Sequence, residues 1–85
     1  MFQTYILHSP SLDKFYVGST QHLNVRLEEH NRGKTTFTRT GMPWQLMYAI
    51  ECDDVIGARE LEMKIKKRGA GRFLDSLHQN ICSAG

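Results

Sequence analysis

The chain has 85 residues and a formal net charge of +2 at pH 7, which permits one small domain with a modest core. Hydrophobic residues at 40% and charged residues at 24% are ordinary for a globular protein. No apolar run reaches the ~20 residues that cross a bilayer, and the N-terminus has no signal-peptide layout. We therefore expect a cytoplasmic protein with no membrane partner. Cys52 and Cys82 show no metal-ligand spacing, and we expect reduced thiols.

The N-terminal segment, residues 2–8, predicts a short strand. Its β-branched and aromatic side chains are those that strands favour, and they alternate between two faces. The two faces consist of Phe2, Thr4 and Ile6, and of Gln3, Tyr5 and Leu7.

A polar turn at residues 10–13 leads into a second strand over residues 14–18, so the two strands form a hairpin. Antiparallel pairing would place Tyr5 and Tyr16 opposite or diagonal to each other. We expect Gly18 to end the second strand. Its lack of a side chain fits either a simple strand end or a close approach of another group to the backbone.

A helix is predicted over residues 21–31, with Ser19 or Thr20 as its N-cap and a glycine after its last turn. Leu23 and Leu27 are one turn apart and would face the core. A second column at i, i+4 spacing, displaced from the leucines, consists of His22, Arg26 and His30.

The polar residues 33–43 predict a surface loop that could contact a nucleic-acid backbone. A third strand follows over residues 44–51, and its near-continuous apolar content predicts that both of its faces are covered. Trp44 and Tyr48 are expected to pack in the core or at an edge rather than stack on bases.

Asp53 or Asp54 caps a second predicted helix, which ends near Arg68. Glu62 falls inside its apolar stripe, whereas Glu60 falls on the far side. A carboxylate on the inward face is costly unless it is paired, hydrogen-bonded or bound to a metal. The stripe itself is formed by Val55, Ala58, Leu61 and Ile65.

Residues 69–71 break this helix, and residues 72–78 can form a last short helix docked by Phe73, Leu74 and Leu77. We expect one domain over residues 1–82 and a frayed tail over residues 83–85. The predicted element order is β-β-α-β-α-α.

These residues resemble the GIY-YIG nucleases. Tyr16-Val17-Gly18 is a close variant of Tyr-Ile-Gly, and Gln3-Thr4-Tyr5 keeps only the tyrosine of Gly-Ile-Tyr. The resemblance covers nearly the whole chain and is to the small single-domain type, similar to the nuclease domain of excision-repair and homing endonucleases. It implies an α/β (α+β) fold, with a three-stranded, largely antiparallel sheet flanked by helices.

The resemblance also implies a catalytic set and a metal-dependent endonuclease activity on DNA, such as structured or branched DNA in repair or recombination. Glu62, shortly before Ile65-Lys66-Lys67, corresponds to the family's metal-binding glutamate, with Mg²⁺ or Mn²⁺ as the cofactor. Arg26 would neutralise the phosphate, and His30 would position water or hydrogen-bond a phenol. Tyr5 would activate the water, with Tyr16 in support or on the phosphate, and which tyrosine is the base stays open.

Clusters of basic residues are suited to phosphate contacts. Because they occur together with the nuclease-like motif, we expect nucleic acid as the partner, and DNA rather than RNA. The alternatives are a non-catalytic nucleic-acid-binding module with the same fold and a protein-interaction domain without nucleic-acid affinity. The predicted nucleic-acid-binding residues are Gly18, Arg32, Lys34, Arg39, Lys66, Lys67 and Arg68.

Overall fold

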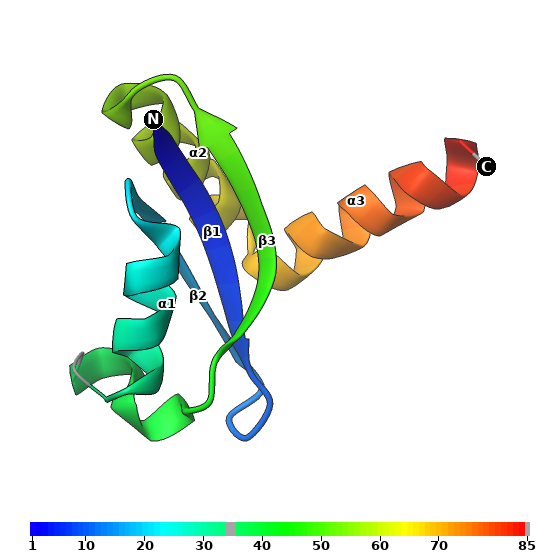
Figure 1. The fold of residues 1–85 in the computed structure, drawn as a ribbon. Helices are drawn as coiled ribbons and strands as arrows, with labels where there is room; N and C mark the ends of the chain where they lie inside the picture. Colours follow the sequence, from blue (N-terminus) through cyan, green and yellow to red (C-terminus); the bar gives the residue numbers. More distant parts are fainter. Residues whose placement is uncertain (34–35, 85) are drawn as a thin grey trace.

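The structure, a computed structural model, describes the backbone of residues 1–33 and 36–84 and the side chains of residues 1–33 and 39–77. A three-stranded antiparallel sheet in the order β2-β1-β3 lies between helices (Figure 1). The strands are β1 (Phe2–Ser9), β2 (Lys14–Thr20) and β3 (Gln45–Cys52). The helices are α1 (Leu23–Asn31), the 3₁₀ helix η1 (Thr36–Gly41), α2 (Val55–Arg68) and α3 (Ala70–Ala84). The predicted fold class and the order β-β-α-β-α-α are confirmed.

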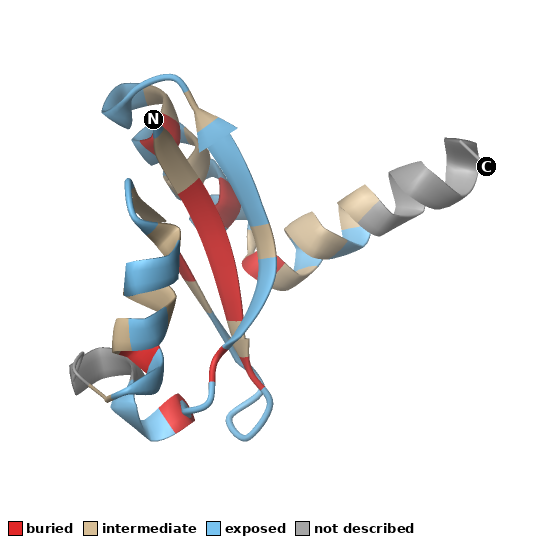
Figure 2. Ribbon diagram, in the orientation of Figure 1, coloured by how far each residue is buried: buried red, intermediate tan, exposed pale blue. Residues whose placement is uncertain are grey.

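The central strand β1 supplies both layers of the core, which Figure 2 shows as its red stretch. Ile6 packs with Val17 and Ile65 on the side of α2. Tyr5 and Leu7 point to the opposite side, where Trp44 and two leucines of α1 cover them. The two faces predicted from alternation along residues 2–8 are therefore confirmed, because side chains in a strand alternate with period two.

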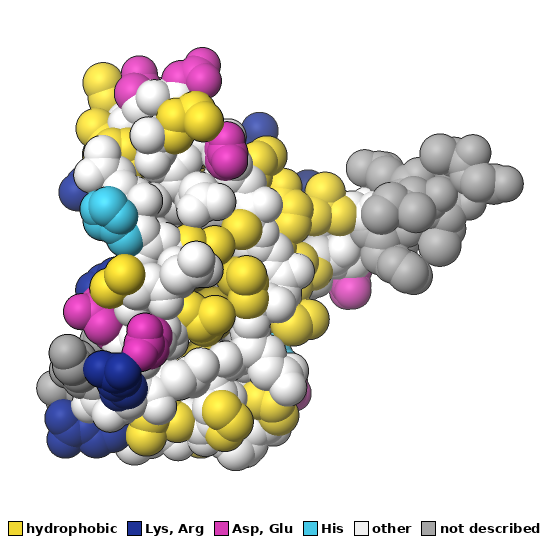
Figure 3. All heavy atoms as spheres, in the orientation of Figure 1, with side chains coloured by type: hydrophobic (Ala, Val, Ile, Leu, Met, Phe, Trp, Pro, Cys, Tyr) yellow, Lys and Arg dark blue, Asp and Glu magenta, His cyan; other side chains and the backbone are white. Residues whose placement is uncertain are grey.

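The third strand does not have the predicted environment. β3 lies at an edge of the sheet, and Leu46, Met47 and Ile50 are all exposed rather than covered on both faces. Apolar side chains gather on this face in Figure 3. A continuous apolar run cannot distinguish a covered strand from an edge strand, which caused the error. Trp44 and Tyr48 do pack as predicted, Trp44 in the core and Tyr48 with its ring centroid 5.4 Å from that of Phe73.

The junction between β2 and α1 also differs from the prediction. β2 continues to Thr20, so Gly18 lies within the strand and does not end it. Helix α1 starts at Leu23 with His22 as its N-cap, and no side chain caps it. Ser19 and Thr20 are strand residues instead, although the Thr20 hydroxyl accepts the His22 N–H at 3.0 Å.

Helix α2 begins as predicted, because the Asp54 carboxylate accepts the Gly57 N–H at 2.8 Å. Ala58 and Ile65 are fully buried, which confirms the phase of the predicted stripe. Val55 is the exception, at 38% exposed in the first turn of the helix.

Gly69, at φ 98°, separates α2 from α3 and confirms the predicted break. Helix α3 is longer than the predicted 72–78 and extends away from the sheet (Figure 1). Phe73 and Leu74 dock it against the core as predicted, and Leu77 is partly buried. The helix includes residues 83 and 84 of the expected tail, and residue 85 is outside the described residues.

The predicted loop over residues 33–43 contains η1, so it is more regular than the sequence indicated. Cys52 is a free thiol as expected, and the side chain of Cys82 is outside the described residues. In the part of the chain that the structure describes, no helix is long and apolar enough to span a bilayer.

Candidate active site

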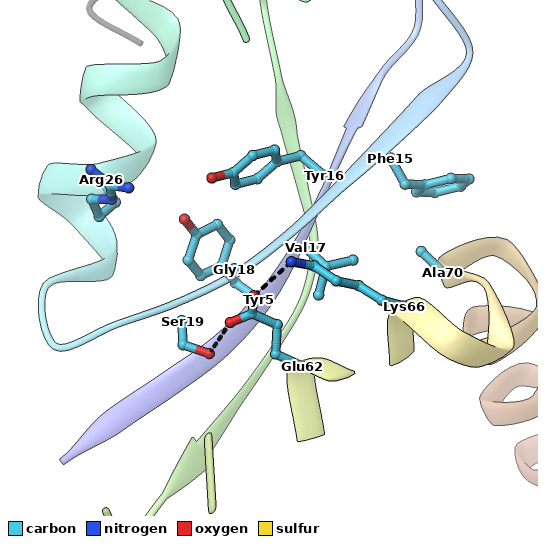
Figure 4. A pocket seen from close by; sticks show the side chains of 10 residues that line it. All are labelled: Tyr5, Phe15, Tyr16, Val17, Gly18, Ser19, Arg26, Glu62, Lys66 and Ala70. Atoms are coloured by element: carbon cyan, nitrogen blue, oxygen red, sulfur yellow. Dashed lines mark hydrogen bonds and ion pairs between the residues drawn. The ribbon is translucent and has the colours of Figure 1, made fainter. Parts of the chain in front are cut away.

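A pocket of about 470 Å³ opens beside β2 (Figure 4). Tyr5, Tyr16, Arg26 and Glu62 line it, so the structure brings together side chains from β1, β2, α1 and α2. These residues are up to 57 positions apart in the sequence, and only the fold brings them together. The remaining lining residues are Phe15, Val17, Gly18, Ser19, Lys66 and Ala70.

Gly18 makes room for the Tyr5 phenol. The two residues face each other in the register of β1 and β2. A Cβ at Gly18 would lie 2.7 Å from the Tyr5 hydroxyl oxygen and 3.2 Å from the Tyr16 ring. Of the two readings of Gly18, close approach is therefore correct, and the approaching group is a side chain of the protein itself. Gly18 is buried beneath Tyr5.

His30 lies behind Tyr5 and is completely buried. Its Nε2 is 3.3 Å from the Tyr5 hydroxyl oxygen, and its ring centroid is 4.8 Å from that of Tyr16. Burial, reinforced by the Arg26 charge, lowers the pKa of His30 from its ordinary value of 6.5. His30 is thus neutral at pH 7 and can accept a hydrogen bond from Tyr5. It does not line the pocket, so its position fits the predicted hydrogen bond to a phenol.

Burial raises the pKa of Tyr5 above its ordinary value of 10.0, and the neighbouring Tyr16 adds to the effect. Arg26 opposes this shift without overcoming it. Tyr5 is therefore neutral in the protein alone, because His30 carries no charge and burial outweighs one guanidinium.

Glu62 points into the pocket, and its side chain is 22% exposed. One carboxylate oxygen accepts the Ser19 hydroxyl at 2.9 Å, and the other pairs with the Lys66 ammonium at 2.7 Å (Figure 4). Glu60 is exposed, so the predicted orientations of the two glutamates are confirmed. The cost of an inward carboxylate is offset here by an ion pair and a hydrogen bond.

The donor atoms around Glu62 fit a cation that keeps most of its water. The carboxylate of Glu62 and the hydroxyl of Ser19 are oxygen donors, which Mg²⁺ and Mn²⁺ prefer. Within the described residues, no group of three or more His, Cys, Asp or Glu side chains could hold a metal ion together. One carboxylate with retained water is a common arrangement for Mg²⁺. In the structure, the Lys66 ammonium pairs with one oxygen of this carboxylate.

Ser19 is a pocket residue that the sequence reasoning missed, because it was assigned to a helix cap. Its hydroxyl contacts Glu62 and the carbonyl oxygen of Ala58, the latter at 3.3 Å. Extending the alternation of β2 by two residues would have placed Ser19 on the same face as Val17, toward α2.

Among the other predicted nucleic-acid-binding residues that the structure describes, Lys66 lines the pocket and the rest do not. Arg32 pairs with Glu28, and Arg39 donates to the Gly33 carbonyl at 3.0 Å. Lys34 is outside the described residues. Of the basic run at the end of α2, only Lys66 reaches the pocket, whereas Lys67 and Arg68 are exposed.

Comparison with known proteins gives the family to which this chain belongs. The GIY-YIG catalytic domain family matches residues 1–71, so the chain belongs to the GIY-YIG family. The chain is also similar to a UPF0213 protein of Syntrophus aciditrophicus (strain SB), with 31% identity over 83 residues that cover 94% of this chain and 95% of that protein. No solved structure gives a significant match. Membership of this family supports a nuclease-type function and nucleic-acid binding.

Proposed function

We propose that this protein is a metal-dependent endonuclease that hydrolyses phosphodiester bonds in DNA, with structured or branched DNA of repair or recombination as its substrate. The observation that carries the proposal is the convergence of Tyr5, Tyr16, Arg26 and Glu62 on one pocket. Each side chain alone has an ordinary structural explanation. A pocket with two phenols, a guanidinium and a carboxylate offers the donors, acceptors and charge that phosphoryl chemistry needs.

Arg26 binds the scissile phosphate in this proposal. Its guanidinium is permanently charged and forked, and it points toward the two phenols (Figure 4). Its ion pair with Glu29, at 3.4 Å, is long and partly exposed, so a phosphate can replace it. Tyr16 lies closer to solvent than Tyr5 and contacts the phosphate or supports Tyr5.

Tyr5 activates the attacking water in this proposal, and His30 orients its hydroxyl. The raised pKa of Tyr5 means that the phenol needs a partner to release its proton. Neutral His30 stands 3.3 Å away and can accept the hydrogen bond of the Tyr5 hydroxyl through Nε2, which orients the phenol. The lowered pKa of His30 makes it a poor site for the proton itself, so the proton leaves to solvent through the open pocket. The phenolate can then remove a proton from water, while Arg26 stabilises the negative charge. His30 is a positioning residue, since it acts through Tyr5.

Glu62 holds Mg²⁺ or Mn²⁺, which supplies charge stabilisation for the phosphate and the leaving oxygen. Lys66, which now pairs with this carboxylate and is 54% exposed, would then be available to contact a neighbouring phosphate. Arg32, Arg39, Lys67 and Arg68 add phosphate contacts outside the pocket, and Lys34 is a further proposed contact that lies outside the described residues.

The second candidate is a non-catalytic nucleic-acid-binding module. Two observations favour it: Glu62 is already paired with Lys66 and Ser19, and Tyr5 is held in its neutral form. Both candidates bind nucleic acid, but only the first one cleaves it.

A panel of labelled single-stranded, duplex, flap and branched DNAs separates the two candidates. The purified protein is incubated with each DNA in Mg²⁺, in Mn²⁺ and in chelator. We expect metal-dependent cleavage, strongest on the flap or branched DNAs. Binding without cleavage of any DNA by the folded protein would establish the binding module instead.

A further inference from the structure

Glu62 and Ser19 also line a second pocket, of about 250 Å³. This volume is below the ~300–1,000 Å³ typical of small-molecule sites, so the pocket suits one part of a polymer better than a free ligand. Because the two pockets share both residues, they form neighbouring compartments on either side of the carboxylate. The other residues of the second pocket are Phe2, Val55, Arg59 and Met63.

Helix α2 aligns the charged residues of the two pockets. Arg59, Glu62 and Lys66 are spaced i, i+3 and i+7, so they lie along one face of the helix. The axial rise of 1.5 Å per residue separates Arg59 from Lys66 by about 10 Å, with the carboxylate between them. A nucleic-acid strand that runs along α2 can therefore place one phosphate at Arg59 and the next at Lys66.

The second pocket combines the guanidinium of Arg59 with apolar side chains. Among the side chains that the structure describes, no carboxylate pairs with Arg59, whereas Lys66 is paired with Glu62. Met63, which is 70% exposed, and the partly buried Phe2 both line the pocket. A cation for the phosphate and an aromatic surface for the base are the usual components of a single-strand nucleotide site.

We propose that this second pocket binds an unpaired nucleotide next to the scissile phosphate, an inference that rests on the proposed nuclease function. Arg59 binds the phosphate of this nucleotide, and its base lies against Phe2 and Met63. A base in a duplex is stacked between its neighbours and cannot enter the pocket. The substrate class is therefore DNA with an unpaired strand at the cleavage position.

Two exposed variants, Arg59→Gln and Met63→Ser, test the pocket without disturbing the core. Binding of labelled flap DNA and of a matched blunt duplex is measured in chelator, from about 50 to about 200 mM salt. We expect Arg59→Gln to weaken flap binding about three- to tenfold and to reduce its salt slope by about one. Met63→Ser should reduce the preference for flap over duplex and leave the salt slope unchanged.

Lys64→Gln is the matched control, because it removes the same charge from α2 and lines neither pocket. Equal effects of Arg59→Gln and Lys64→Gln on both DNAs would overturn the inference, and so would a wild-type protein that binds flap and duplex equally. Cleavage is assayed separately in Mg²⁺. A protein that binds flap DNA through Arg59 but never cleaves would refute the proposed nuclease function and leave the unpaired-nucleotide site standing.

Discussion

Replacing Glu62 by glutamine tests the centre of the proposed site with the smallest change of shape. The amide oxygen of the glutamine can still accept a hydrogen bond from the Ser19 hydroxyl, so the 2.9 Å hydrogen bond of the wild-type protein can be retained. The ion pair with Lys66 is lost, but an i, i+4 pair contributes only about 0.3–0.5 kcal/mol, and the Lys66 side chain, 54% exposed, can turn to water. For a domain of this size, the melting temperature should fall by about 2–4 °C.

The effect on metal binding should be far larger than the effect on stability. Mg²⁺ that binds only the folded wild-type protein stabilises it by about 1.4 kcal/mol at ten times its Kd, which raises the melting temperature measurably. An amide is a poor ligand for a hard cation, so Glu62→Gln should lose this rise. The cleavage rate should fall at least about 100-fold, because the charge stabilisation lost amounts to several kcal/mol. DNA binding in chelator should persist.

Glu60→Gln is the internal control, because it makes the same charge change on the exposed side of α2. It should keep the Mg²⁺-dependent rise in melting temperature and the wild-type cleavage rate. If Glu62→Gln keeps both properties, or Glu60→Gln loses them, the carboxylate has been misassigned and the proposed metal site is wrong.

Three further predictions concern the tyrosine cluster. Tyr5→Phe should lower the rate of flap DNA cleavage about 10²–10⁴-fold, and Tyr16→Phe should lower it less. Wild-type cleavage rates in both variants would show that the two hydroxyls have only structural roles. The lowered pKa of His30 means that the unfolded chain takes up a proton more readily, so its contribution to stability is present above pH 6.5 and is lost as the pH falls. His30→Gln should therefore flatten the fall in melting temperature from about pH 7.5 to about pH 5, whereas the exposed His22→Gln should retain it. Gly18→Ala should cost about 1–3 kcal/mol in thermal or urea unfolding, because its Cβ would meet the Tyr5 hydroxyl at 2.7 Å, and an unchanged stability would contradict that contact.

Local periodicity was enough to predict the elements whose two sides differ strongly. The alternation in residues 2–8 predicted the faces of β1, and the 3.6-residue period of α2 predicted that Glu62 points inward and Glu60 outward. The N-cap at Asp54 and the break at Gly69 were also readable, because each depends on the chemistry of its own residue.

Features that depend on distant partners could not be predicted in this way. The sequence of β3 contains nothing that says whether a helix covers it, and its edge position follows from the sheet order. The i, i+4 spacing of His22, Arg26 and His30 could not show that His30 is completely buried, because its burial depends on contacts with β1 and β2. Arg59 carried no prediction, because its pocket also needs Phe2 of β1, which only the fold brings close to α2.

Gly18 links the fold to the chemistry of the pocket. β2 is an edge strand and Tyr5 belongs to the central strand, so a side chain on β2 opposite Tyr5 would stand between the phenol and the pocket. Directly opposed residues in an antiparallel pair have Cβ atoms about 4.5–5.5 Å apart, which leaves no room for a tyrosine ring to lie across its neighbour. Glycine removes that obstacle, and the Tyr5 hydroxyl can then reach the pocket while its other side remains against buried His30. A buried phenol with one side toward a neutral imidazole and the other toward the pocket requires a glycine at this register position.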